Sequence, residues 1–225
     1  MILPCPALCK RILLCGILTL IPALLWTQTA RDDVFNHPLN GETRPHFTAI
    51  CAAMAEHRLM RGNFVQTKTL KRLGRSLVSQ GNFVVDAGLG IIWDTRSPYP
   101  SVMAVGRDFV VQSSGGRTTR LDTADNAAFV RISETMGAVF TGDIQKLTGN
   151  FEVFFTGQQK NWALGLVPKD SVIRSFARAI VITGDSAVRT VTLYEQNGDT
   201  VVYELSDHSY PSALSSNERA YFSVP

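Results

Sequence analysis

The chain has 225 residues, of which 45% are hydrophobic and 18% are charged, and its formal net charge is +3. This length suits one domain with a full core, and the balance of apolar to charged residues argues against a disordered or collagen-like chain. The Lys and Arg residues are scattered rather than gathered in a basic stripe, so nucleic acid is not an expected partner.

The first thirty residues differ from the rest of the chain. Lys10 and Arg11 precede an apolar run over residues 12–26, and polar residues follow from Thr27. The run is shorter than the about 20 residues that cross a bilayer as a helix, and Pro22 interrupts it. We therefore predict a signal peptide over residues 1–30 and export to the periplasm, with an uncleaved inner-membrane anchor as the alternative.

Residues 31–225 are predicted to form a single domain. Its only cysteine is Cys51, because the other three lie in the leader, and no internal disulfide can form. Residues 31–45 are polar and rich in turn formers, which predicts a mobile N-terminal segment. Phe47, Ile50, Cys51 and Met54 then recur at helical spacing, which predicts an amphipathic helix over residues 45–59.

After this helix the hydrophobic period changes from 3.6 to 2, which predicts short strands joined by turns. In the segment SQGNFVVDAGLGIIWDT, two alternating runs flank a turn at Ala87-Gly88, as in a hairpin. Gly115-Gly116 and Asn197-Gly198 are further turn signals. The first group of strands is expected over residues 64–70, 81–86, 90–96, 102–106 and 109–113.

Residues 125–147 interrupt the strands with apolar side chains at helical spacing, which predicts one or two short helices. The second group of strands is expected over residues 150–156, 161–167, 177–183, 188–196, 199–206 and 219–224. The expected fold is therefore mainly β, an incomplete antiparallel β-barrel of about eleven strands. A sheet this wide curls to hide its apolar face, and the few helices would form a lid over its mouth.

No familiar catalytic or metal-binding motif is present. The four histidines show no metal-ligand spacing, and the chain lacks a nucleophile elbow, a phosphate-binding glycine loop and a dinucleotide fingerprint. We therefore predict a protein that is not an enzyme and has no cofactor and no metal. Apolar and aromatic residues on strands are the prominent feature instead, and they would form either a filled core or a ligand cavity.

Two segments carry a resemblance to a known family: GNFVQTKTLKRLGRSLVSQGNFVVDAGLGIIWDTRSPYPSVMAV and NWALGLVPKDSVIRSFARAIVITGDSAVRTVTLYEQNGDTVVYELS. The aromatic-x-Gln opening at Phe64 and Gln66, the GNF strand start, the Trp93 strand, Pro98 after it and Pro168 before the last strands follow the family's order. Over residues 61–206 the chain resembles the LolA-type outer-membrane lipoprotein carriers, as a divergent member.

The resemblance implies a periplasmic carrier, or chaperone, that binds acyl chains of lipoproteins in the half-barrel and moves them from an inner-membrane exporter to an outer-membrane acceptor. A monomer is expected. The implied cavity residues are Phe64, Phe83, Val85, Ile91, Trp93, Val102, Phe151, Val153 and Phe155. The implied lid residues are Phe47, Ile50, Met54, Met136, Val139 and Phe140.

One position departs from the family pattern. Where the best-known carriers have an arginine in the turn before the tryptophan strand, which ties the lid to the barrel, this chain has Ala87. Nearby Arg75 or Arg96 is a candidate substitute.

Three other functions stay open on the sequence. The first is a carrier of another lipid or glycolipid for a membrane exporter. The second is an adaptor with a filled barrel. The third is a periplasmic acyl hydrolase, which would need Ser113 or Cys51 beside His46, His57 or His208.

Overall fold

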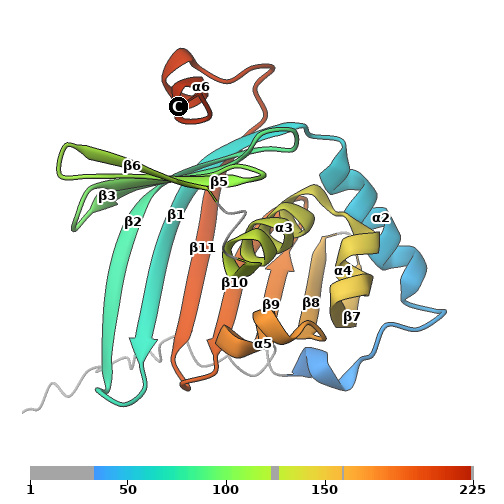
Figure 1. Cartoon of the computed structure of the whole chain (residues 1–225). Helices are drawn as coiled ribbons and strands as arrows, with labels where there is room; N and C mark the ends of the chain where they lie inside the picture. The colour runs from blue at the N-terminus through green and yellow to red at the C-terminus, as the bar shows by residue number, and fades with distance from the viewer. Residues whose placement is uncertain (1–32, 123–126, 159, 224–225) are drawn as a thin grey trace, which may run out of the picture.

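The computed structural model describes residues 33–122, 127–158 and 160–223, so the predicted signal peptide lies outside the described residues. One antiparallel sheet of eleven strands organises this part of the chain, in the order β6-β5-β4-β3-β2-β1-β11-β10-β9-β8-β7 (Figure 1). The strands are β1 (Leu59–Leu70), β2 (Arg75–Asp86), β3 (Gly90–Ser97), β4 (Ser101–Val105), β5 (Phe109–Ser114), β6 (Arg117–Asp122), β7 (Phe151–Gln158), β8 (Asn161–Pro168), β9 (Ala177–Gly184), β10 (Val188–Glu195) and β11 (Thr200–Ser209).

The sheet curls but does not close, because β6 and β7 are its two edges and are not paired with each other. Helices α3 (Ala127–Thr141) and α4 (Ile144–Asn150) connect these edges, and with α2 (Arg44–Ala55) and α5 (Ser171–Phe176) they cover the concave face over β7 to β10 (Figure 1). The predicted incomplete barrel with a helical lid is confirmed. In the described part of the chain, no helix is long and apolar enough to cross a membrane.

The alternation of side chains along the strands separates two apolar clusters. Phe64 and Phe83 point to the concave face and belong to the larger cluster beneath the helices. Val84 and Ile92 point to the convex face, where a smaller cluster is covered by Leu214 and by the residues around α6 (Ser216–Tyr221). The sheet therefore separates a lidded interior from a second, smaller core.

The structure differs from the sequence prediction at the C-terminus, where residues 219–224 were expected to form a strand. Ser215 and Glu218 instead form a capping box that begins α6. The two carboxylate oxygens of Glu218 also accept hydrogen bonds from Nε and Nη2 of Arg61 on β1, at 2.6 and 2.5 Å. Reciprocal capping and this ion pair stabilise a short helix where the apolar pattern alone suggested a strand.

The sheet still has eleven strands, because it contains β6, a strand that was not predicted from the sequence. Arg117–Asp122 has five exposed residues out of six and no buried side chain, so it lacks the apolar alternation from which a strand is predicted. It pairs with β5 across the predicted Gly115-Gly116 turn. Backbone hydrogen bonding, rather than burial, defines this edge strand.

The segment after the signal peptide was expected to be mobile, and this is wrong for its described part. Val34, in the short helix η1 (Val34–Asn36), is fully buried. The Leu39 N–H donates to the Val153 carbonyl and the Phe155 N–H donates to the His37 carbonyl, both at 2.9 Å. These bonds dock the segment along the exposed edge of β7.

The predicted helix over residues 45–59 ends earlier than expected, at Ala55, and β1 begins at Leu59. The predicted hairpin turn at Ala87-Gly88 is confirmed as the connection between β2 and β3. The hairpin of β1 and β2 is longer than predicted, since both strands have twelve residues. Its distal half extends beyond the helices that cover the concave face (Figure 1).

Candidate functional site

The interior beneath the helices is lined by an aromatic group on β1, β2 and β3. The rings of Phe64 and Trp93 are stacked with centroids 4.3 Å apart, and Phe83 lies 5.9 Å from Trp93. Tyr203 on β11 meets Trp93 edge-on at 5.2 Å. Burial raises the pKa of Tyr203 to about 12, with a smaller contribution from the charge of Glu195. The phenol therefore stays neutral in this apolar setting.

Strands β7 and β8 supply the other half of the interior. Phe151, Val153 and Phe155 alternate inward along β7, and all three are buried. Trp162 on β8 is also buried, and its indole N–H donates to the Asp185 carbonyl at 2.8 Å, so the indole has a partner for its polar atom. These side chains face the inner surfaces of α2 and α4.

The lid is built from the residues that the helical spacing singled out. Phe47, Ile50 and Cys51 are the buried residues of α2, and Phe47 lies 5.8 Å from Phe155 between ring centroids. Val139 and Phe140 of α3 are also buried in the same cluster, with Phe140 stacked 6.0 Å from Phe83. The side chain of Met136 lies outside the described part of the structure.

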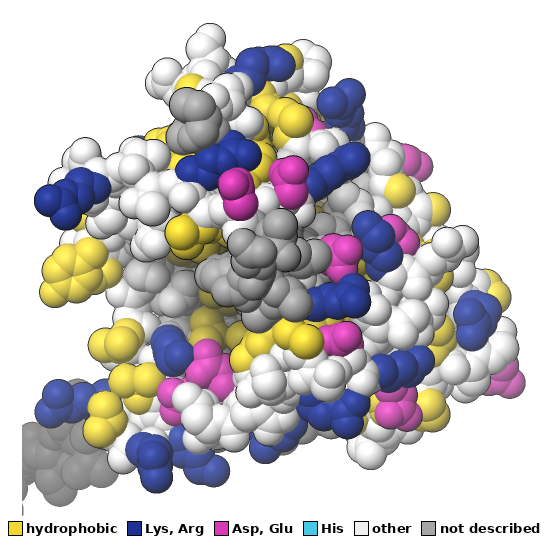
Figure 2. Space-filling model, viewed as in Figure 1, with side chains coloured by type: hydrophobic (Ala, Val, Ile, Leu, Met, Phe, Trp, Pro, Cys, Tyr) yellow, Lys and Arg dark blue, Asp and Glu magenta, His cyan; other side chains and the backbone are white. Residues whose placement is uncertain are grey.

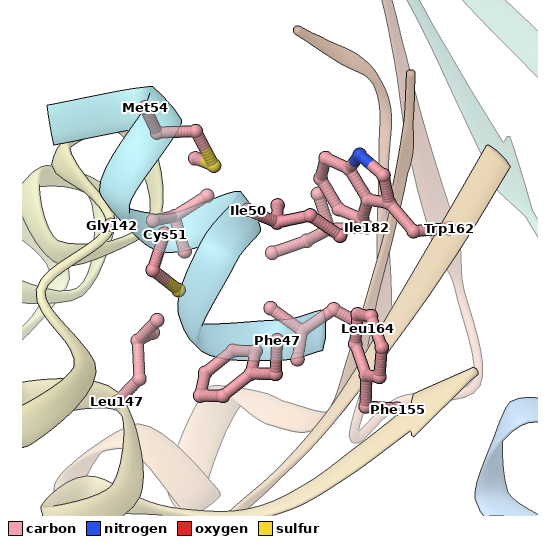
Figure 3. Close-up of a pocket in the computed structure, with 11 residues that line it drawn as sticks. Phe47, Ile50, Cys51, Met54, Gly142, Leu147, Phe155, Trp162, Leu164 and Ile182 are labelled. Atoms are coloured by element: carbon pink, nitrogen blue, oxygen red, sulfur yellow. The ribbon is translucent and has the colours of Figure 1, made fainter. Parts of the chain in front are cut away.

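Figure 3 shows how these groups meet, with Ile50 of α2 pointing toward Trp162 and Ile182 of the sheet. They surround an apolar pocket with a cavity volume of about 10 Å³. A second pocket of about 20 Å³ adjoins it at Met54. Volumes of this size hold about one water molecule each. The helices therefore lie closed on the sheet, and a lipid chain could enter these pockets only if the helices moved away from it.

The second pocket has a more polar border than the first. His57, Arg58, Ser186 and Tyr210 line it together with apolar side chains that include Met60, Val85, Phe140 and Val188. The rings of His57 and Tyr210 are stacked 3.7 Å apart at this border. An apolar floor with a polar border is an arrangement that can hold an amphipathic molecule.

Eight of the nine predicted cavity residues belong to the cluster beneath the helices, and Val102 does not. Val102 lies opposite Asp94 on β3, whereas Met103 lies opposite Trp93. Because paired residues of antiparallel strands point to the same face, Val102 faces the convex side and packs in the second cluster. The placement of Val102 in the cavity was wrong by one position in register.

Sequence reasoning missed several inner residues on the later strands. Leu164, Ile182, Val188 and Met60 all line the two pockets. Strand β9 is buried at six of its eight positions, so its sequence shows an apolar run without alternation and does not indicate which side chains point inward. Met60 was missed because it lies between the predicted helix, which ended at residue 59, and the first predicted strand, which began at residue 64, whereas β1 begins at Leu59.

Neither Arg75 nor Arg96 ties the lid to the barrel. Arg75 is exposed at the far end of the β1–β2 hairpin, and Arg96 pairs with Asp94 on its own strand. Arg58, just after α2, lies at the β2–β3 turn instead: its carbonyl accepts from the Ala87 N–H, and its Nε lies 3.9 Å from Asp86 Oδ1. The Arg58 side chain is 77% exposed, so this ion pair contributes less than about 1 kcal/mol. The tie is weak.

The side chains required for an acyl hydrolase are not assembled. Burial raises the pKa of the Cys51 thiol to about 12, which is the opposite of an activated nucleophile. The Ser113 hydroxyl accepts from Thr118 Oγ1. Among the described residues, no hydrogen bond joins Cys51 or Ser113 to a histidine. Nothing in this geometry favours covalent catalysis.

Several solved structures are similar to this chain. A LolA superfamily protein from Nitrosomonas europaea is 10% identical, covering 75% of this chain and 95% of its own, with a TM-score of 0.42. The lipoprotein LppX from Mycobacterium tuberculosis is 12% identical over 76% of this chain and 99% of its own, with a TM-score of 0.44. LprF from Mycobacterium bovis is 12% identical over 80% of this chain and 98% of its own, with a TM-score of 0.38.

No curated protein matches the chain in sequence. The family model described as outer membrane lipoprotein carrier protein LolA-like matches residues 47–213, which is about three quarters of the chain. This range runs from the first buried residue of α2 to the residue before Leu214, so it spans the lid and the whole sheet. The chain therefore belongs to the LolA-like family of outer membrane lipoprotein carrier proteins.

Proposed function

We propose that this protein is a periplasmic carrier that binds the acyl chains of lipoproteins between the concave face of its sheet and its helices. On this proposal it receives them from an inner-membrane exporter and delivers them to an outer-membrane acceptor, without catalysing a reaction. The observation that carries the proposal is the apolar interior shared by the sheet and the lid. Family membership supports the same role.

The contacts of α2 with the sheet support a lid that opens. They are apolar, and within the described residues no ion pair joins α2 itself to a strand. Moving α2 away would expose Phe47, Ile50 and Met54, at about 1.5–3 kcal/mol for each side chain. Burying about ten methylenes of an acyl chain returns about 8 kcal/mol. The two terms are of similar size, so an acyl chain can replace the helix with little net change in free energy.

This exchange also accounts for release. Apolar contacts do not require one geometry, and Met54 in particular can adapt its flexible side chain to cargo or to the empty pocket. A cargo held by a few kilocalories of net free energy can pass to an acceptor that offers a larger apolar surface. A rigid pocket with many polar contacts would hold its ligand more specifically and release it more slowly.

The test is native mass spectrometry of protein purified from periplasm under mild conditions, with organic extraction of any bound molecule. We expect acylated peptide to accompany the wild-type protein and to be reduced in Met54→Asp, because Met54 borders both pockets. Tyr99→Asp is the control, since Tyr99 lies in the turn between β3 and β4 and is 82% exposed. It should retain the cargo of the wild type.

Each other result changes the conclusion. Phospholipid or glycolipid in place of acylated peptide would show a carrier of another lipid. A protein that is empty and also fails to take up added lipopeptide or fatty acid would refute the carrier and favour a filled-barrel adaptor. Release of free fatty acid from added lipopeptide would refute the non-catalytic role.

A further inference from the structure

The far end of the β1–β2 hairpin exposes aliphatic side chains on both of its faces. Leu73 in the turn is 67% exposed, Leu77 is 59% exposed and Val78 is 56% exposed. Leu77 and Val78 are consecutive residues of β2, so they point to opposite faces of the hairpin. A protein surface that docks on one face would cover only one of them. An environment that surrounds the hairpin end would cover both.

The same turn carries exposed positive charge. Lys71, Arg72 and Arg75 are exposed, and within the described residues none of them forms an ion pair. The sequence contains no acidic residue between Glu56 and Asp86. Figure 2 shows yellow and dark-blue side chains at the lower left of the molecule, where Figure 1 places this turn, with magenta carboxylates beside them.

Two carboxylates beside the hairpin are already engaged. Glu195 accepts two hydrogen bonds of 2.9 Å from Lys68 Nζ. Asp199 is only 8% exposed, and its Oδ1 accepts from the Lys71 N–H at 3.0 Å, which fixes the turn against the β10–β11 connection. The turn is thus held in place by its backbone while its cationic side chains remain available for an anionic surface.

We propose that this hairpin end, defined as residues 71–78, inserts into the interface of an anionic lipid bilayer. Its three cationic groups would lie among lipid phosphates, and its three aliphatic side chains would enter the boundary between headgroups and acyl chains. Leu77 lies on the same face of the sheet as Phe83 and therefore on the side of the lidded interior. Insertion would bring this end of the sheet to the membrane, with Leu77 on the side of the lidded interior and Val78 on the opposite side. The inference does not depend on the identity or presence of a cargo.

The expected effects follow from general magnitudes. Each Lys or Arg near an anionic surface contributes about a fivefold increase in partitioning, so replacing three lowers it by about a hundredfold. Removing two leucine side chains from the interface lowers it by more than about tenfold. The electrostatic part is screened by salt, whereas the aliphatic part is not.

The experiment is co-sedimentation of the protein, in the form that the cell exports, with vesicles of phosphatidylcholine alone or mixed with phosphatidylglycerol. We expect binding to the anionic vesicles at low salt, much weaker binding at high salt, and weak binding to phosphatidylcholine. The triple variant Lys71→Gln, Arg72→Gln, Arg75→Gln and the double variant Leu73→Ser, Leu77→Ser should both lose binding. All variants carry the same N-terminus, so that segment cannot explain a difference between them.

The control makes one change of each kind elsewhere, as Arg117→Gln with Leu121→Ser on β6, and should bind like the wild type. Circular dichroism verifies that each variant is folded. As a second measurement, an environment-sensitive fluorophore on Leu73→Cys should shift to the blue with anionic vesicles. No binding by the wild type, equal binding by the hairpin variants, or equal binding to neutral vesicles would overturn the proposal. An unshifted fluorophore would overturn insertion.

Discussion

The contact between α2 and α3 depends on a residue without a side chain. Gly142 follows α3 with a φ of +64°, in the left-handed region. A Cβ at this position would lie 2.8 Å from Cys51 Cα and also against the Cys51 carbonyl oxygen. Gly142→Ala would therefore strain its own backbone and push α2 away from α3.

The loss of stability in Gly142→Ala is the sum of these two effects. A left-handed conformation costs an L-residue about 1–2 kcal/mol, and overpacking against a backbone costs about 1–3 kcal/mol. We expect Gly142→Ala to lower the free energy of unfolding in urea by about 2–5 kcal/mol. Because the strain falls on the helix that buries Cys51, the thiol should also react faster with a disulfide reagent in the folded protein.

Gly137→Ala, within α3 itself, is the matched control. A Cβ at Gly137 would meet no heavy atom within 4 Å apart from its chain neighbours and the backbone of its own helix, and alanine favours a helix over glycine by about 1 kcal/mol. Gly137→Ala should therefore stabilise the protein slightly and leave the Cys51 thiol unreactive. Unfolding of Gly142→Ala at the same urea concentration as the wild type, or equal destabilisation of both alanine variants, would contradict the role given to Gly142.

Three further predictions concern other parts of the molecule. The Arg61 guanidinium lowers the pKa of Glu218 from 4.5 to about 2, so the pair stabilises the folded state fully above pH 4.5 and this contribution is lost as the pH falls toward 2. Glu218→Gln should be less stable by about 1–3 kcal/mol at neutral pH in thermal or urea unfolding, and a difference that persisted at pH 2 would contradict this. Burial raises the pKa of the Cys51 thiol from 9.0 to about 12, so its contribution to the free energy of unfolding is complete below pH 9 and is lost as the pH rises toward 12. In urea unfolding across this range, the stability of Cys51→Ala should therefore decline less steeply than that of the wild type. Val85→Thr should reduce the lipid that accompanies the purified protein, whereas Val102→Thr should not, because the two side chains face opposite sides of the sheet; equal loss in both would contradict the assigned faces.

Local patterns in the sequence were enough to predict the class of fold. Alternation in segments such as the one around Phe83 predicts strands, the turn at Ala87-Gly88 predicts a hairpin, and eleven short strands with few helices can hide their apolar faces only by curling. These are local patterns, and they are readable because each strand has to bury one face. The helical spacing of Phe47, Ile50 and Met54 marked the lid for the same reason.

The predictions from sequence were wrong for elements whose structure is not set by a buried face of their own. Strand β6 has no buried face to produce alternation, and α6 is stabilised by a hydrogen bond to Arg61, more than 150 residues away. Val102 was given the wrong face because β4 is short and its register depends on pairing with β3. Each of these features depends on a partner distant in the chain.

The candidate site, too, could be predicted from the sequence only in part. Apolar residues on strands could be recognised from their spacing, but a core and a ligand cavity use the same residue types, so composition cannot separate them. Only the tertiary structure showed that the interior is closed, with room for about one water in each pocket, and that the cover over it is held mainly by apolar contacts. Likewise, the sequence supplied Arg58 and Asp86, but only the packing of α2 against the β2–β3 turn brought them together. Packing density and long-range contacts exist only in the folded chain, whereas hydrophobic periodicity can be recognised in the sequence.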